Sequence, residues 1–149
     1  MKIRQATLKD AEEISKLIDR NLGKDYKPFK ITKELVEEKM SDKNNKFFVA
    51  VSDNKIIGSI RYSIVNLDLA ELRWLVVDNP YRNKGIGTNL TRAALNSLKR
   101  KNMRKVVGRT QSNNKFSIRI LLELSFYIEG YFKEHYREGT DILQFAKFL

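Results

Sequence analysis

One junction, between residues 70 and 98, constrains the fold of this chain more than any other part of its sequence. Residues 70–77 are mostly apolar and end in two valines, a pattern that predicts a strand. From Ile86 onward the period changes, because Leu90, Ala94 and Leu98 recur at helical spacing. Between the two patterns lies a turn that contains glycine. The chain therefore passes from a strand through a turn into a helix, as in proteins that layer helices on a sheet.

The same two periods divide the rest of the chain. A period of two predicts strands at residues 2–6, 47–51, 56–65, 105–110, 126–132 and 142–148. Helical spacing predicts helices at residues 7–23, 32–40 and 116–124, with Gly23 as the end of the first. No repeat or linker interrupts the chain, so we predict one domain over residues 1–149. Its class is α/β, with a mixed sheet of about seven strands flanked by about four helices.

Composition excludes several classes of protein. The chain is 42% hydrophobic and 32% charged, as in a globular rather than a disordered protein. No apolar run approaches the roughly 20 residues of a membrane-spanning helix, and the N-terminal residues lead straight into patterned sequence. Cysteine is absent, so a disulfide, a thiolate metal site and a cysteine nucleophile are excluded. We expect a cytoplasmic protein with no membrane span, no signal peptide and no bound metal.

Positive charge is concentrated in one segment. The chain has 29 Lys and Arg against 18 Asp and Glu, a net charge of +11, yet residues 79–122 contain no acidic residue. The basic residues of that segment are Arg82, Lys84, Arg92, Lys99, Arg100, Lys101, Arg104, Lys105, Arg109, Lys115 and Arg119. This distribution indicates a polyanionic partner, which could be a nucleotide cofactor or nucleic acid. The alternative is a solvated basic surface that serves solubility.

The turn before Ile86 has the chemistry of a phosphate site. Amide groups in the first turn of a helix lack an intrahelical acceptor and carry the positive end of the helix dipole. Gly85 and Gly87 are expected to keep side chains away, so that phosphate oxygens reach the backbone, while Arg82 and Lys84 add charge. The three glycines and downstream acidic residue of a dinucleotide fingerprint are missing, and so is a Walker loop.

Three separated segments resemble the GCN5-related N-acetyltransferase (GNAT) family. Residues 77–87, Val-Asp-Asn-Pro-Tyr-Arg-Asn-Lys-Gly-Ile-Gly, resemble its acetyl-CoA-binding signature, Arg/Gln-x-x-Gly-x-Gly/Ala after a strand. Residues 3–7 with Asp10 resemble its opening strand and helix, and Asn114 followed by Leu124-Ser125-Phe126 resembles its "Asn … Leu-Gly-Phe" segment. The resemblance implies an enzyme that moves an acetyl group from acetyl-CoA to a primary amine by direct attack in a ternary complex.

The resemblance also implies which residues meet the cofactor. The backbone of Leu75, Val76 and Val77 would pair with the pantetheine arm like an added strand. Asn114 would reach the pantetheine through its side chain, although it could equally be a helix cap. The pyrophosphate would meet the amides of Arg82, Asn83, Lys84, Gly85, Ile86, Gly87 and Thr88.

Glu71 is the candidate general base, because several family members carry a glutamate eleven residues before the position of Arg82. A protonated amine cannot attack a thioester, so a base must take its proton. By strand alternation Glu71 is expected to share a face with Leu75 and Val77, and Leu72 to share the other face with Trp74 and Val76. The alternative is that Glu71 only pairs with Arg73 or with a cross-strand cation.

The general acid is where the chain departs from the family pattern. Many relatives have a Tyr five residues before the Phe of Leu-Gly-Phe, and here that position is Leu121. Another hydroxyl could serve, or the thiolate could leave unaided. Tyr131 and His135 are the candidate proton carriers, in a sequence that also holds Tyr127 and Tyr136 nearby.

Two other functions stay open at this point. Leu121 makes a catalytically silent acyl-CoA-binding relative the main alternative. A nucleic-acid-binding module is the weaker one, because the basic segment contains only two aromatic residues. The amine acceptor, a small molecule or a protein amine, is not identified by the sequence. Residues 23–29 and 131–141 are expected to form its pocket, and the final strands could support a homodimer.

Overall fold

The order of helices and strands agrees with the order predicted from the sequence. The computed structural model describes residues 1–27 and 29–149. The elements are β1 (Lys2–Gln5), α1 (Ala11–Tyr26), α2 (Lys33–Ser41), β2 (Asn45–Ser52), β3 (Lys55–Ile64), β4 (Leu69–Val77), α3 (Ile86–Arg100), β5 (Lys105–Gln111), α4 (Lys115–Glu123), β6 (Tyr127–Arg137) and β7 (Thr140–Phe148). Short 3₁₀ turns, Leu8–Asp10 and Asn79–Tyr81, precede α1 and α3.

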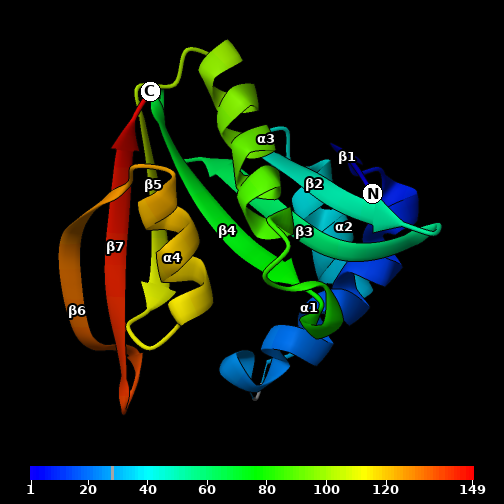
Figure 1. The fold of residues 1–149 in the computed structure, drawn as a ribbon, viewed down its shortest axis with the longest axis horizontal. Coiled ribbons are helices and arrows are strands. Elements are labelled where there is room, and N and C mark those ends of the chain that lie inside the picture. Colours follow the sequence, from blue (N-terminus) through cyan, green and yellow to red (C-terminus); the bar gives the residue numbers. More distant parts are fainter. Residues whose placement is uncertain (28) are drawn as a thin grey trace.

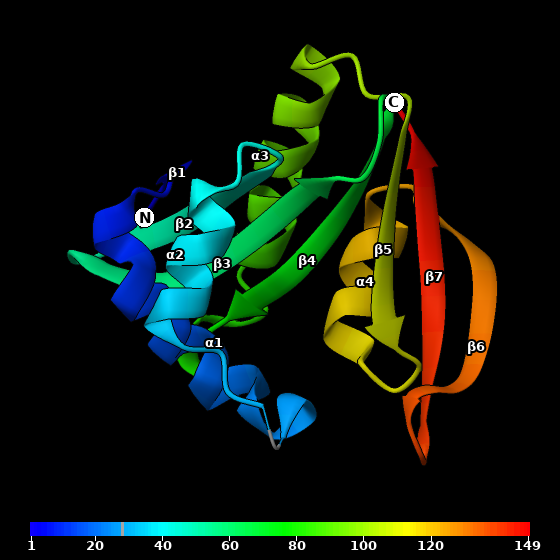
Figure 2. The same cartoon turned by 180° about the vertical axis from the view of Figure 1, so that it is seen from behind.

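The strands form one mixed sheet with helices on both faces. Over the described ranges it has seven strands in the order β1-β2-β3-β4-β5-β7-β6, and the β4–β5 pair is parallel while the others are antiparallel. Helices α3 and α4 cover one face, and α1 and α2 cover the other (Figures 1 and 2). Both views show β4 and β5 starting side by side near the C-terminus and then diverging. This divergence creates the candidate site.

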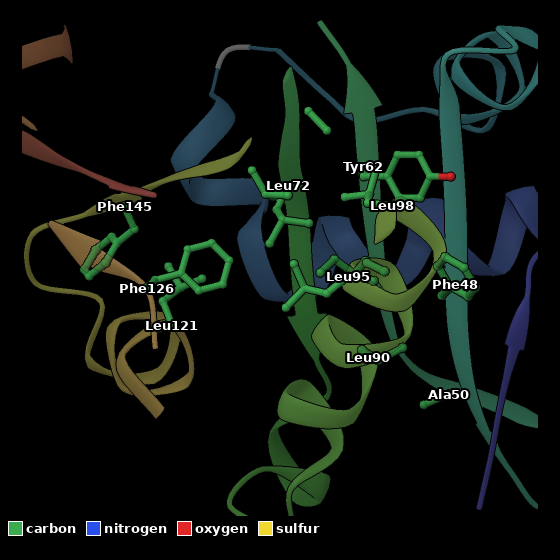
Figure 3. Close-up of a cluster of buried hydrophobic side chains, with 14 of the residues drawn as sticks. Phe48, Ala50, Tyr62, Leu72, Leu90, Leu95, Leu98, Leu121, Phe126 and Phe145 are labelled. Carbon is green, nitrogen blue, oxygen red and sulfur yellow. The ribbon is translucent and has the colours of Figure 1, made fainter. Parts of the chain in front are cut away.

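Two hydrophobic clusters hold the layers together. The larger lies between the sheet and α3 and α4, and it includes Tyr62, Leu72 and Leu121 (Figure 3). The Tyr62 hydroxyl is hydrogen-bonded to the Ser97 hydroxyl of α3 at 3.0 Å, so its polar group is satisfied although the ring is buried. The smaller cluster packs α1 and α2 against the opposite face.

A β-bulge in β4 overturns the predicted alternation of that strand. Trp74 has a φ of 54°, and the register with β3 shifts between Ser59 and Arg61. After the bulge, Leu75 and Val77 pack with the α3 cluster, on the same face as Leu72. Trp74 and Val76 pack with the α1 cluster. The expectation that Leu72 shares a face with Trp74 and Val76 was therefore wrong, because the extra residue reverses the order of the faces.

Helix α1 continues beyond Gly23, where the sequence predicted its end. It runs to Tyr26, so Gly23 occupies a helical position in its last turns. A glycine inside a helix costs only about 1 kcal/mol relative to alanine, which neighbouring contacts can offset. The extension places Asp25 in the wall of the cavity described below, next to Leu22 of the preceding turn.

Candidate active site

The divergence of β4 and β5 opens a cavity of about 520 Å³. The two parallel strands pair only from Leu69–Lys105 to Leu72–Gly108. Beyond Leu72, the β5 side of β4 has no paired strand within the described ranges. Leu75 of this open stretch lines the cavity, whereas Val76 and Val77 are buried in the two cores. A ligand in the cavity can therefore reach Leu75, whereas Val76 and Val77 do not line the cavity.

The cavity has two chemically different ends. Towards α3 and α4 its wall includes Thr91, Ser117 and the buried Leu121. Towards the last turns of α1 and the β6–β7 hairpin its wall combines the apolar Leu22 and Phe29 with polar and charged residues. The polar lining residues at this end include Asp25, Lys27, Tyr136, Arg137 and Thr140.

The glycine turn leaves the N-terminus of α3 without a side-chain cap. Gly85 is the N-cap residue, with a φ of 80° and open space where a Cβ would project. The backbone N–H of Asn89 donates to the Gly85 carbonyl at 3.0 Å. The amides of residues 86–88 precede this bond, so they are the donors that a helix N-terminus offers to an anion. Residues 82–88 do not line the cavity; Thr91, one helical turn further on, does.

Gly87 lies in close contact with α4. A Cβ at this position would lie 2.6 Å from Ile120 Cδ1 and 3.0 Å from Phe116 Cζ. Gly87 therefore allows α4 to pack closely against the start of α3, and it is itself buried. Of the two glycines, Gly85 is the one that faces open space.

Arg82 turns its guanidinium back into the protein. Its Nε donates to the Val77 carbonyl at 2.9 Å, and its Nη2 donates to Asn21 Oδ1 at 3.3 Å. Asn21 also donates to Asp78, which forms an ion pair with Arg20 at 2.6 Å. The two hydrogen bonds from Arg20, and then the one from Asn21, hold the pKa of Asp78 below its ordinary value, although burial opposes them. This network fixes the start of the turn against α1.

Glu71 lies in the cavity wall and forms an ion pair with Arg73. Arg73 Nη2 lies 3.1 Å from Glu71 Oε1, and the Glu71 side chain is 17% exposed. Glu71 therefore lines the cavity and pairs with Arg73 at the same time. The pairing that the sequence offered as an alternative is present, and it does not remove the carboxylate from the cavity.

Asn114 is both a helix cap and a cavity-lining residue. Its Oδ1 accepts a hydrogen bond from the Ser117 amide at 3.1 Å and caps α4. It also lines the cavity, so its amide nitrogen is the part of the side chain that could meet a ligand there.

Leu121 presents an apolar surface where many relatives have a tyrosine, and neither predicted substitute lines the cavity. Tyr131 is exposed, and its hydroxyl donates to Asp141. His135 is exposed and packs against the rings of Phe132 and Tyr136. Tyr136 lines the cavity, and its hydroxyl accepts a hydrogen bond from Arg109 Nη1 at 2.9 Å. The sequence carried no signal for this pair, because 27 residues separate its members.

The two segments expected to form the acceptor pocket do meet. Arg137 of β6 donates to the Asp25 carbonyl at 3.0 Å, and its Nη2 forms an ion pair with Asp25 Oδ1 at 3.2 Å. Lys27 and Phe29 line the cavity beside this contact, while Pro28 lies outside the described residues. The β6–β7 hairpin is therefore tied to the end of α1.

In the fold, the basic residues of the segment 79–122 lie at several separate places on the molecule. Three of its cations pair with carboxylates from outside residues 79–122, in the ion pairs Arg104–Asp68, Lys105–Glu129 and Arg119–Glu123. Residues 99–101 lie at the C-terminal end of α3, about 22 Å along the helix from the glycine turn. Arg109 lines the cavity. A polyanion bound at the glycine turn therefore cannot contact all the basic residues of this segment.

No helix in the described part of the chain combines the length and the apolar character needed to cross a membrane. Residues 1–27 and 29–149 also contain no grouping of three His, Cys, Asp or Glu side chains that could hold a metal ion.

Comparisons with known proteins agree on one family. The model of the acetyltransferase (GNAT) family matches residues 11–126. An N-alpha-acetyltransferase of Saccharolobus solfataricus is 27% identical over 97% of this chain and 91% of its own length. N-alpha-acetyltransferase 30 of Xenopus laevis is 28% identical over 68% of this chain, which spans about two fifths (39%) of that protein.

A solved structure of an aminoglycoside 6'-N-acetyltransferase complexed with coenzyme A superimposes with a TM-score of 0.86 at 17% identity, covering 99% of this chain and 97% of that one. At this identity the likeness concerns the fold. The family match covers most of the chain, from α1 through the glycine turn to Phe126. The chain therefore belongs to the GNAT family of acetyltransferases.

Proposed function

We propose that this protein transfers an acetyl group from acetyl-CoA to a primary amine by direct attack in a ternary complex. The observation that carries the proposal is the cavity, which joins the side of α3 and α4 to the α1–hairpin mouth and has Glu71 in its wall. The coenzyme A complex of the aminoglycoside acetyltransferase, which has the same fold, supports the choice of donor.

The residues present suit a nucleotide thioester. The uncapped N-terminus of α3 offers amides to the pyrophosphate, and the open stretch of β4 offers backbone groups to the pantetheine arm. Glu71 would take the proton of the ammonium, directly or through water, so that the free amine attacks the thioester carbonyl. The Tyr136 hydroxyl, which accepts from Arg109, keeps its own proton for donation and could protonate the departing thiolate.

The names of the relatives favour an α-amine of a polypeptide as the acceptor. The mouth between α1 and the β6–β7 hairpin is the entrance available to such a chain end. Protein N-termini are therefore the first acceptors to test, before lysines, polyamines and other small amines.

Release of CoA from acetyl-CoA in the presence of a panel of amines tests the proposal. We expect release that depends on the amine and a product that is heavier by one acetyl group. Leu121 in the cavity wall favours a second candidate, a silent acyl-CoA-binding relative. That candidate predicts acetyl-CoA binding by calorimetry with no CoA release from any amine in the panel.

A further inference from the structure

The charged residues of the cavity are unbalanced. Its wall contains the carboxylates Asp25 and Glu71 and four cations, Lys27, Arg73, Arg109 and Arg137. Arg73 pairs with Glu71, and Arg137 pairs with Asp25. Among the described residues, neither Lys27 nor Arg109 forms an ion pair with a carboxylate. The cavity that must accept an amine is therefore net positive.

Arg109 is held in place by neutral partners. Its Nε donates to Gln144 Oε1 at 2.9 Å, its Nη1 donates to the Tyr136 hydroxyl at 2.9 Å, and its guanidinium lies 5.0 Å from the centre of the Phe132 ring. Gln144 is itself fixed, because its Nε2 donates to Glu129 at 2.5 Å. These contacts fix the orientation of the Arg109 guanidinium, and none of them is with a carboxylate that would neutralise its charge. A fixed guanidinium is well suited to bind a carboxylate.

This arrangement has a consequence for the acceptor. A simple protonated amine entering the cavity meets a net positive wall, which disfavours it. An acceptor that carries a carboxylate close to its amine brings the missing negative charge with it. We propose that the acceptor has this chemistry and that Arg109 binds its carboxylate. The inference rests on the proposed amine acetylation and narrows its substrate class to an amine with an anionic group beside it.

Two sources could supply this chemistry, an acidic N-terminus of a peptide or a free amino acid. The experiment therefore uses matched pairs of short peptides that begin with Asp or Asn, and with Glu or Gln, together with free aspartate and a polyamine. We expect kcat/KM for the acidic member of each pair to exceed that for its amide by about tenfold or more. A kcat/KM for free aspartate that equals the kcat/KM for the acidic peptides would show that a free amino acid, and not a peptide N-terminus, is the acceptor.

Variants test whether Arg109 causes the preference for acidic peptides over their amides. Arg109→Gln should bring the acid-to-amide ratio close to one, and Arg109→Lys should restore part of it. Tyr136→Phe should keep the ratio even if it slows turnover, since it leaves the guanidinium charge. Arg104→Gln removes an exposed guanidinium outside the cavity and should change nothing. An unchanged ratio in Arg109→Gln, or a preference of the parent protein for the amides or for the polyamine, would overturn the inference.

Measurements of peptide binding without turnover can test this inference independently of the proposed function. Calorimetry with protein saturated with CoA compares the two peptides of a pair without any turnover. Tighter binding of the acidic peptide that is lost in Arg109→Gln, together with no acetyl transfer, would contradict the proposed function and support the inference. Equal binding of both peptides would overturn the inference even in an active enzyme.

Discussion

Arg20 in α1 donates two hydrogen bonds to Asp78, at 2.8 and 2.6 Å, and so ties the first helix to the residue that follows β4. The same α1 carries Leu22 and Asp25 to the mouth of the cavity. The pair therefore sets the position of the acceptor end of the cavity relative to the glycine turn. Under the proposed function, this pair sets the distance between the acceptor and the bound acetyl-CoA.

Asp78→Asn should destabilise the protein at neutral pH by about 1–3 kcal/mol, because Arg20 loses its charged partner in a partly buried site. The folded pKa of Asp78 lies below its ordinary value of 3.8, so its contribution is fully present above that value. The contribution is lost as the pH falls through the folded pKa. Urea unfolding at pH 7 and near pH 3 should show the difference between parent and variant shrinking in acid. Asp53→Asn, at an exposed turn, is the control, and an equal effect there would contradict the assignment.

Gly85 allows the phosphate assignment to be tested with two nearly isosteric variants. Asn and Asp both tolerate a positive φ, and no atom lies within 4 Å of the position of the new Cβ. Gly85→Asp places a negative charge at the helix N-terminus and should weaken acetyl-CoA binding tenfold or more beyond Gly85→Asn, an effect of about 1.4 kcal/mol. Calorimetry at two salt concentrations measures this, and equal affinities would remove the pyrophosphate from this turn.

Gly87→Leu should lower the stability of the protein without any ligand present. The new side chain would collide with Ile120 and Phe116, and overpacking of this kind costs about 1–3 kcal/mol. Urea unfolding of the ligand-free protein checks this expectation. Unchanged stability would show that α4 can move away from α3 at little cost.

Regular periodicity is what made the fold predictable. The stripe of Ile86, Leu90, Ala94 and Leu98 buries one face of α3, and each of the four is buried in the structure. Interruptions to the periodicity were not predictable. A positive φ at Trp74 has no sequence signal, since bulky side chains rarely adopt it, yet it exchanges the faces of β4.

The candidate site was predictable only where its residues are neighbours in sequence. The glycine turn was proposed from local spacing, and Glu71 from the family resemblance, which places a glutamate eleven residues before Arg82. The Arg109–Tyr136 and Arg137–Asp25 contacts join residues separated by 27 and 112 positions, so they depend on the tertiary fold. The position of the positive charge of residues 79–122 on the surface depends on the tertiary fold for the same reason, because the acidic partners of Arg104 and Lys105 come from other segments.

Glu71→Gln should decide whether this carboxylate is the base or only the partner of Arg73. If Glu71 is the base, the variant should lower kcat/KM by about 10²- to 10⁴-fold at neutral pH, where the amine is protonated. The loss should be smaller at high pH, where the amine is already deprotonated. The affinity for acetyl-CoA should stay unchanged, because the carboxylate acts on the amine. Arg73→Gln removes the same ion pair and leaves the carboxylate in the cavity, so it is the matched control. Equal losses in both variants, with pH–rate profiles that match the parent's, would show that the ion pair matters and that Glu71 takes no proton.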